Sequence, residues 1–214
     1  MTSYFGVVVG RTVGVFGSLK NCMRSVDKFK DSKYQEFSNI ESAVKYVTGS
    51  THPAKLVFVD GSYRDINGCK SCGIGIYYGS KDGRNLSISL KMEDTSQTSM
   101  RMELLAICRA LKNVQRDSST SKYCILSDSA SSIHAITVSA PSWATRGWCS
   151  NRKKPIPNMH LIRECYGYYE FINKKYQKNG WGKLDIVYVQ SHCGIEGNKE
   201  ADSLACSAAK SNPI

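Results

Sequence analysis

The sequence predicts an α/β protein in which a small α/β unit precedes a mixed five-stranded sheet with helices on both faces. The length and composition fit this fold class, because 214 residues with 41% hydrophobic and 22% charged side chains can build one small and one medium domain. The order of the apolar runs fits it as well. Three strand-like runs follow one another after residue 54, and helical and strand-like segments then alternate.

Residues 1–48 form the small unit in this prediction. Two β-rich runs flank Gly10-Arg11, which is a hairpin signal, and Ser38 with Glu41 has the spacing of a capping box. The expected elements are strands over 4–9, 12–16 and 34–37, a helix over 19–26, and a helix that follows the capping box to residue 47. Residues 49–54 are small or polar and include Pro53, so they predict a short linker.

The larger unit comprises residues 55–214 and begins with an apolar run that stops at Asp60. A turn signal at 81–84 joins the next two strand-like runs, and apolar stripes at helical spacing mark the helices. The expected strands cover 56–59, 73–78, 86–92, 123–126 and 185–189, and the expected helices lie around 104–114, 133–136, 158–178 and 197–208.

Positive charge is concentrated in one segment of the larger unit. Residues 142–184 hold nine Lys or Arg against two Asp or Glu, which is most of the formal net charge of +11. The segment also contains all three tryptophans, Trp143, Trp148 and Trp181. Basic and aromatic side chains together suit a polyanion with stackable bases, although a solvated helix face over core tryptophans has the same composition. The run Arg152-Lys153-Lys154, flanked by prolines, favours nucleic acid.

Composition excludes several other classes of protein. No stretch approaches 18 consecutive apolar residues, so we expect no membrane span. The N-terminus has neither the pattern of a signal peptide nor a clear mitochondrial presequence. The nine scattered cysteines are typical of reduced thiols, and the lone pair Cys69 and Cys72 lacks the second pair of a zinc site. We therefore expect an intracellular monomer, in the nucleus, the cytoplasm or both.

Four carboxylates stand apart from ordinary surface charge. Asp60 and Asp128 each end an apolar run, which predicts that both lie at the C-terminal edge of the sheet. Glu103 and Asp202 lie near the starts of two helices. Each residue alone has an ordinary explanation as a turn residue or a partner of a helix dipole. Together they would repel one another unless a cation such as Mg²⁺ lay between them, and two such ions could activate a water against a phosphodiester.

The sequence around these carboxylates forms four blocks in a fixed order. They are Val59-Asp60-Gly61-Ser62, Gln97-Thr98-Ser99-Met100-Arg101-Met102-Glu103, Leu126-Ser127-Asp128-Ser129, and His192-Cys193-Gly194-Ile195-Glu196-Gly197-Asn198-Lys199-Glu200-Ala201-Asp202. The last block matches the pattern HxGxxGNxxAD without a gap. Over residues 55–210, this series resembles the type 1 ribonuclease H family.

This resemblance implies the ribonuclease H fold and an endoribonuclease that hydrolyses the RNA strand of RNA/DNA hybrids, leaving 5′-phosphate and 3′-hydroxyl ends. It implies two Mg²⁺ ions, which Mn²⁺ can replace, held by Asp60, Glu103, Asp128 and Asp202. His192 matches the histidine on a loop that assists product release or proton movement.

The resemblance also implies contacts to the substrate. Thr98 and Asn158 match two members of a phosphate-binding pocket whose third member, an arginine in vertebrates, is Ser96 here. Ser99 replaces an asparagine that contacts the substrate backbone, and its hydroxyl has a shorter reach. Trp148 is our candidate for packing on DNA sugars. The segment with Arg152-Lys153-Lys154 matches a basic protrusion that grips the DNA strand.

The small unit carries a second resemblance. It rests on Tyr4-Phe5-Gly6-Val7, Gly10-Arg11, Gly14-Val15-Phe16, Cys22, Val26 and Phe37, and it is to the hybrid-binding domain of eukaryotic ribonucleases H1, which also occurs in caulimovirus viroplasmin.

That domain stacks DNA on a tryptophan and a second aromatic residue. Leu19 stands at the tryptophan position, Tyr34 stands at the other, and Gln35-Glu36 replaces a lysine pair. We therefore expect a weak hybrid binder, with Phe5 and Tyr34 as its candidate contacts, or a module used for protein contacts. The aromatic residues have an equally good explanation as core.

Two alternatives remain open at this point. The chain could be a catalytically weak or inactive hybrid-binding protein derived from a ribonuclease H, although all four carboxylates are present. It could also keep the fold and act on branched DNA, although the Gln97-Thr98 and HxGxxGN blocks favour hybrids.

Overall fold

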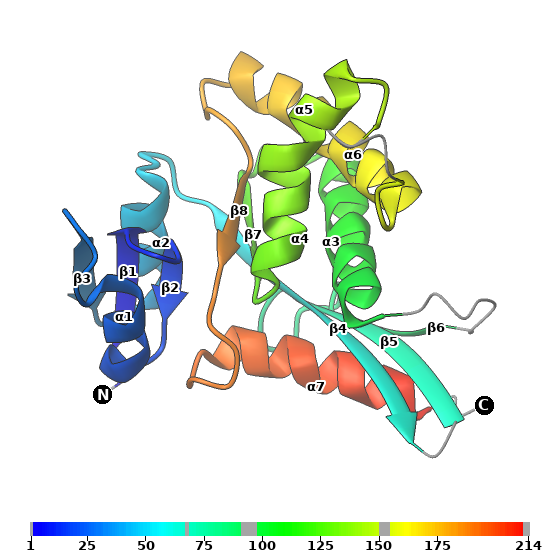
Figure 1. The fold of residues 1–214 in the computed structure, drawn as a ribbon, viewed down its shortest axis with the longest axis horizontal. Helices are drawn as coiled ribbons and strands as arrows, with labels where there is room; N and C mark the ends of the chain where they lie inside the picture. Colours follow the sequence, from blue (N-terminus) through cyan, green and yellow to red (C-terminus); the bar gives the residue numbers. More distant parts are fainter. Residues whose placement is uncertain (1, 67–68, 91–97, 150–154, 212–214) are drawn as a thin grey trace.

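The structure is a computed structural model that describes residues 2–66, 69–90, 98–149 and 155–211. Residues 2–48 form an N-terminal module (Figure 1). Its elements are β1 (Tyr4–Val9), β2 (Gly14–Phe16), α1 (Leu19–Val26), β3 (Lys33–Phe37) and α2 (Ile40–Thr48). Strand β1 lies between β2 and β3 and is antiparallel to both. The capping box was placed one residue early, because Asn39 caps α2 and its Oδ1 accepts the Ser42 N–H at 2.8 Å.

The second sheet consists of β4 (Lys55–Ile66), β5 (Cys69–Tyr77), β6 (Leu86–Leu90), β7 (Tyr123–Ser127) and β8 (Asp185–Tyr188). Its strand order is β6-β5-β4-β7-β8. Strands β7 and β8 continue the sheet in parallel with β4, whereas β5 and β6 form antiparallel pairs on the other side. The predicted mixed five-stranded sheet is therefore confirmed.

Helices cover both faces of this sheet, as predicted. They are α3 (Ser99–Arg116), α4 (Ala130–His134), α5 (Ala140–Thr145), α6 (Met159–Lys178) and α7 (Glu196–Lys210), and a π-helical turn (Ala135–Ser139) joins α4 to α5. Figure 1 shows α7 across one side of β4 and β5, with α3 and α6 on the other side. Among the described residues, the structure has no helix that combines the length and the apolar character needed to cross a membrane.

Alternation along the strands explains the two cores. Val57 and Val59 of β4 point into the core that contains α3 and α6, whereas Phe58 points into a second core on the opposite face. The second core includes Val15 and Val44 of the N-terminal module together with residues of the larger sheet and α7. The module is therefore packed against the sheet.

Candidate active site

Asp60 and Asp128 meet at one edge of the sheet, but not quite as the sequence predicted. The parallel pairing of β4 with β7 ends at Phe58 and Leu126, and β4 then continues to Ile66 beside β5 alone. The prediction that the strand ends at Asp60 is therefore wrong. Asp60 still lies just beyond the end of the β4–β7 pairing, and Asp128 directly follows β7, so the two carboxylates converge.

Glu103 joins them from the fifth position of α3. The side chain of Thr98 caps this helix, and its Oγ1 accepts the Arg101 N–H at 3.2 Å. The helix lies directly on β4 at Gly61, where an added Cβ would overlap the Met102 carbonyl carbon. A glycine after Asp60 therefore allows the backbone approach that brings Glu103 next to it.

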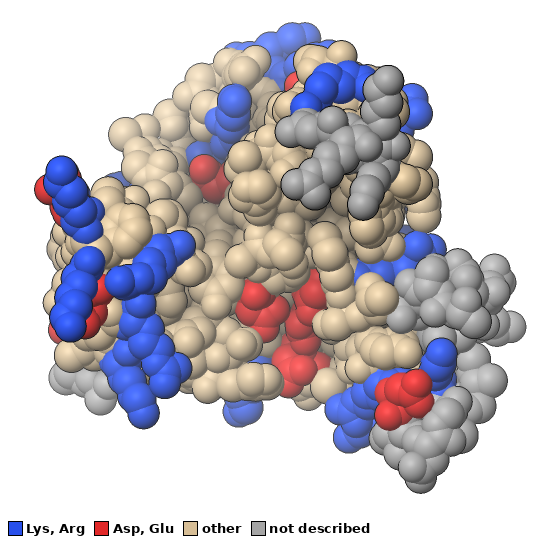
Figure 2. All heavy atoms as spheres, in the orientation of Figure 1, with Lys and Arg blue, Asp and Glu red and all other residues tan. Residues whose placement is uncertain are grey.

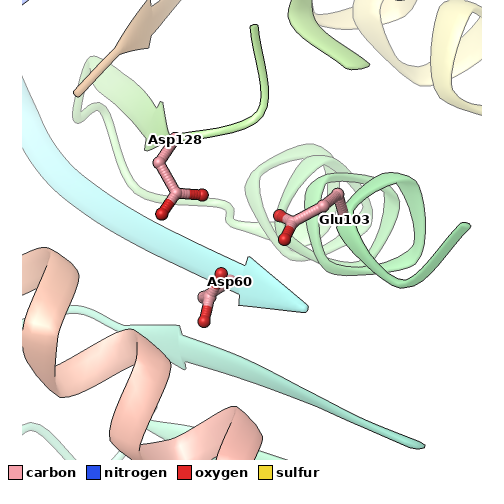
Figure 3. Close-up of side chains that lie close together, drawn as sticks. All are labelled: Asp60, Glu103 and Asp128. Atoms are coloured by element: carbon pink, nitrogen blue, oxygen red, sulfur yellow. The ribbon is translucent and has the colours of Figure 1, made fainter. Parts of the chain in front are cut away.

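The three carboxylates form one compact group. Each of Asp60, Glu103 and Asp128 offers an oxygen, and these oxygens all lie within 4.8 Å of one another. Figure 3 shows the three side chains pointing toward a common space from β4, α3 and the end of β7. Asp202 lies beside Asp60, in the second turn of α7 rather than the first, because α7 begins at Glu196. Its Oδ1 accepts a hydrogen bond from the Cys206 thiol at 3.3 Å.

Burial and mutual repulsion both disfavour negative charge in this group. The pKa of Glu103 is raised by burial, by the charges of Asp60 and Asp128, and by a hydrogen bond to Asp60. The pKa of Asp60 is raised by burial and then by the charges of Asp128 and Asp202. Burial also raises the pKa of Asp128, but a hydrogen bond from Asn198 and the charge of His192 oppose this effect.

These residues fit a divalent cation. The Oε2 atom of Glu103 is buried and has no hydrogen-bond partner, and a buried unpaired carboxylate oxygen is costly. Oxygen ligands of this kind are those that hard divalent cations take. A cation in the common space would neutralise the repulsion and satisfy that oxygen.

Asn198 is a site residue that sequence reasoning did not single out. Its side chain is 3% exposed, and Nδ2 donates to Asp128 Oδ2 at 3.3 Å. The available signal was its place in the HxGxxGN block. The hydrogen bond orients the Asp128 carboxylate toward the group.

His192 is exposed on the segment between β8 and α7, residues 189–195, which we name the His192 loop. Its backbone has φ +51°, in the left-handed region, and Gly194 follows with φ +80°. The imidazole lies close enough to Asp128 for its positive charge to lower the pKa of that carboxyl. The structure therefore brings His192 to the carboxylate group.

Two of the predicted phosphate contacts lie close to each other. Arg101 links them, because its N–H is bonded to Thr98 Oγ1 and its Nη1 donates to Asn158 Oδ1 at 3.3 Å. Ser99 is exposed at the start of α3. Ser96 lies outside the described residues.

Trp148 follows α5 in the chain, and its half-buried side chain packs against α6. Its ring contacts Tyr166 edge to face, with centroids 6.1 Å apart, and the Arg163 guanidinium lies 5.9 Å from the ring centroid. Arg152, Lys153 and Lys154 lie outside the described residues. The contacts predicted for this segment therefore stay predictions.

The two aromatic candidates of the N-terminal module, Phe5 and Tyr34, differ in solvent exposure. Phe5 is 6% exposed and packs with Val7, Phe16 and Cys22 in the core of the module, so its predicted contact with nucleic acid is wrong. Tyr34 is 43% exposed on β3 and remains available.

The surface around the carboxylates has a mixed charge pattern. Figure 2 shows a group of acidic side chains in a hollow, with Lys and Arg side chains on either side of it, including over the N-terminal module at the left. A hollow of this kind could hold cations at its centre and attract a polyanion at its rims.

Comparison with known proteins agrees with this geometry. A family model described as RNase H matches residues 52–210, which include all four carboxylates and His192. The chain belongs to the RNase H family. A second model, described as the Ribonuclease H1 N-terminal domain, matches residues 3–47.

Individual relatives point the same way. The chain is 30% identical to ribonuclease H of Schizosaccharomyces pombe, over 85% of this chain and 65% of that protein. It is 25% identical to ribonuclease H1 of Rattus norvegicus, over 97% of this chain and 89% of that protein. The chain thus spans less than two thirds of its yeast relative. The PFV RNase H domain, known from a solution structure, is similar in fold, with a TM-score of 0.57 and 20% identity over 73% of this chain and 94% of that domain.

Proposed function

We propose that this protein is an endoribonuclease that hydrolyses the RNA strand of RNA/DNA hybrids and leaves 5′-phosphate and 3′-hydroxyl ends. The observation that carries the proposal is the group formed by Asp60, Glu103 and Asp128 in a member of the RNase H family. Asp60 and Glu103 are buried, Asp128 is half-buried, and their mutually repelling oxygens lie within 4.8 Å of one another. We also propose that residues 55–214 are the catalytic domain, joined by a linker over 49–54 to a module over 1–48.

The three carboxylates would hold divalent ions, with Asp202 as a fourth ligand. We propose two Mg²⁺ ions, with Mn²⁺ as a substitute, because oxygen ligands suit both metals. When bound, such ions supply an activated water and stabilise charge on the leaving oxygen of a phosphodiester.

The side chains of the chain perform the remaining steps. Asn198 holds the Asp128 carboxylate in orientation through its Nδ2. Glu103, on α3, is buried and points toward the space that it shares with Asp60 and Asp128, and its Oε2 has no hydrogen-bond partner (Figure 3). His192 is exposed beside Asp128, and its imidazole ring can accept or donate a proton as the product leaves.

Substrate choice would follow from contacts outside the carboxylate group. An RNA strand is distinguished from DNA by its 2′-hydroxyl groups. Thr98 and Asn158, linked by Arg101, would contact phosphate, and Trp148 would pack on the sugars of the DNA strand. The basic rims of the hollow would attract the hybrid without reading its sequence (Figure 2).

The substitution Asp128→Asn tests this function. It keeps the size of the side chain and a partner for Asn198, but removes a charged ligand, so we expect cleavage of a hybrid to fall by more than about 100-fold. Binding of the hybrid should remain, since the contacts to phosphate and sugar are untouched. Glu196→Gln is a suitable control because Glu196 is exposed and lies outside the group. Equal cleavage by Asp128→Asn and the parent would refute the assigned site.

A further inference from the structure

The N-terminal module contacts the His192 loop through its backbone. Val15 of β2 forms a parallel bridge with Val189, and the Gln190 N–H donates to the Val15 carbonyl at 3.0 Å. β2 and β8 are both edge strands of their own sheets. The contact therefore joins two open sheet edges at the point where the His192 loop begins (Figure 1).

Apolar packing holds the module in this place. Val15, Ala43 and Val44 are all at most 5% exposed, and they share a core with Leu126 and Val187 of the larger sheet. These module side chains cover an apolar face of β7 and β8. A module packed in this way has a defined position relative to the loop, unlike a domain on a flexible tether.

Further contacts reach the residue next to His192. The backbone of Gly17 lies directly on Cys193, since an added Cβ would overlap the Cys193 carbonyl oxygen. The Asn21 side chain, on α1, donates from Nδ2 to Cys193 Sγ at 3.0 Å, and that thiol donates to the Ser191 carbonyl at 2.9 Å. Cys193 is thus held by two residues of the module.

The conformation of the loop needs such support. His192 has φ +51°, and a residue with a side chain persists in the left-handed region only where its surroundings hold it there. The next residue along the chain is the one that Gly17 and Asn21 contact.

We propose that the N-terminal module positions His192 beside Asp128, with Gly17 and Asn21 as positioning residues that act through Cys193. This role rests on the proposed function, because it is exerted through a residue of the active site. It gives the module a task in catalysis that does not depend on its own affinity for nucleic acid.

Hydrogen exchange tests the contact independently of activity. In Gly17→Ala, the new Cβ must push Cys193 away, so we expect the amides of residues 189–195, including that of Gln190, to exchange about tenfold faster or more. Gly167→Ala is a matched control, because nothing lies within 4 Å of a Cβ at that helical position. Exchange at parental rates in Gly17→Ala would overturn the proposal. If that variant does not fold, Asn21→Ala, which deletes one hydrogen bond, replaces it under the same criterion.

Kinetics test whether the contact acts through His192. Misplacing a catalytic group by about 1 Å can cost about 100-fold, so we expect Gly17→Ala to lower kcat about tenfold and to change KM by less than about twofold. In a His192→Ala background, the same substitution should lower kcat by less than about twofold, because no imidazole remains to be misplaced. An equal fall in both backgrounds, or an effect confined to KM, would overturn the proposal.

The two tests separate this proposal from the proposed function. If the parent protein does not cleave hybrids, the proposed function fails, and the exchange rates of the His192 loop still decide whether the module holds it. If the parent cleaves hybrids and the exchange rates are unchanged in Gly17→Ala, only the positioning role fails.

Discussion

Replacing Asp60 by Asn should stabilise the folded protein in the absence of divalent cations. Asp60 is 6% exposed, and burial and the charges of Asp128 and Asp202 raise its pKa. The charge of Asp60 in turn raises the pKa of Glu103. Two unit charges 4.8 Å apart repel by about 3.5 kcal/mol at an effective dielectric constant of about 20. Partial protonation reduces this repulsion, so we expect a gain of about 1–3 kcal/mol in the free energy of unfolding.

The gain should depend on pH in a defined direction. An unfolded Asp has a pKa of about 3.9, and in the fold the pKa of Asp60 is raised. A raised pKa means that the parent fold loses stability as pH rises from about 4 through the pKa of the folded state. Asp60→Asn removes this loss, so its advantage should be small near pH 4 and largest near about pH 8.5.

Urea unfolding in EDTA, followed by tryptophan fluorescence, measures this difference. Glu196→Gln is the control, since substitution of an exposed carboxylate changes stability by no more than about 0.5 kcal/mol. Equal or lower stability of Asp60→Asn at about pH 8.5 would show that the carboxylates do not repel one another as their geometry implies.

Three further outcomes follow from the structure. Mg²⁺ or Mn²⁺ at about 100 times its Kd at high pH should stabilise the parent by about 2.7 kcal/mol in thermal unfolding. The same metal concentration should stabilise it less at low pH, where protonated carboxylates bind the cation more weakly. Asp60→Asn should gain much less than the parent at high pH, and equal gains would contradict a site at this residue. Tyr176→Phe should cost about 1–3 kcal/mol in urea unfolding because it leaves the buried Tyr123 N–H without its acceptor, and a neutral result would contradict that hydrogen bond. Changing both Gln35 and Glu36 to Lys should strengthen hybrid binding and steepen its salt dependence by up to about 0.9 per added phosphate contact; an unchanged slope in titrations at several salt concentrations would mean that β3 does not face the substrate.

Local patterns in the sequence predicted much of the fold correctly. The apolar runs of β1, β7 and β8 were placed to within a residue or two, because each is short and bounded by polar or turn residues. The end of β4 was missed because Gly61-Ser62-Tyr63 has no apolar pattern, and its pairing with β5 alone extends the strand.

The candidate site was predictable as a set of residues but not as a geometry. Asp60, Glu103 and Asp128 were selected from their blocks, yet their separation depends on how α3 approaches β4 at Gly61, which is a tertiary contact. Phe5 was misassigned because one strand residue reads equally well as core or as surface until the neighbouring helix is placed.

The docking of the N-terminal module could not be read from the sequence. Val15 and Val44 look like core residues of the small unit, and only the assembled structure shows that they pack with Leu126 and Val187. A short linker predicts proximity but not which surfaces meet.

Cleavage of an end-labelled RNA/DNA hybrid with Mg²⁺, beside matched double-stranded RNA, double-stranded DNA and single-stranded RNA, tests the central claim most directly. We expect cuts only in the RNA strand of the hybrid, with 5′-phosphate ends, and their loss in EDTA. Folded protein that binds the hybrid but cuts nothing with either Mg²⁺ or Mn²⁺ would contradict the claim and indicate a binding protein built on the same fold.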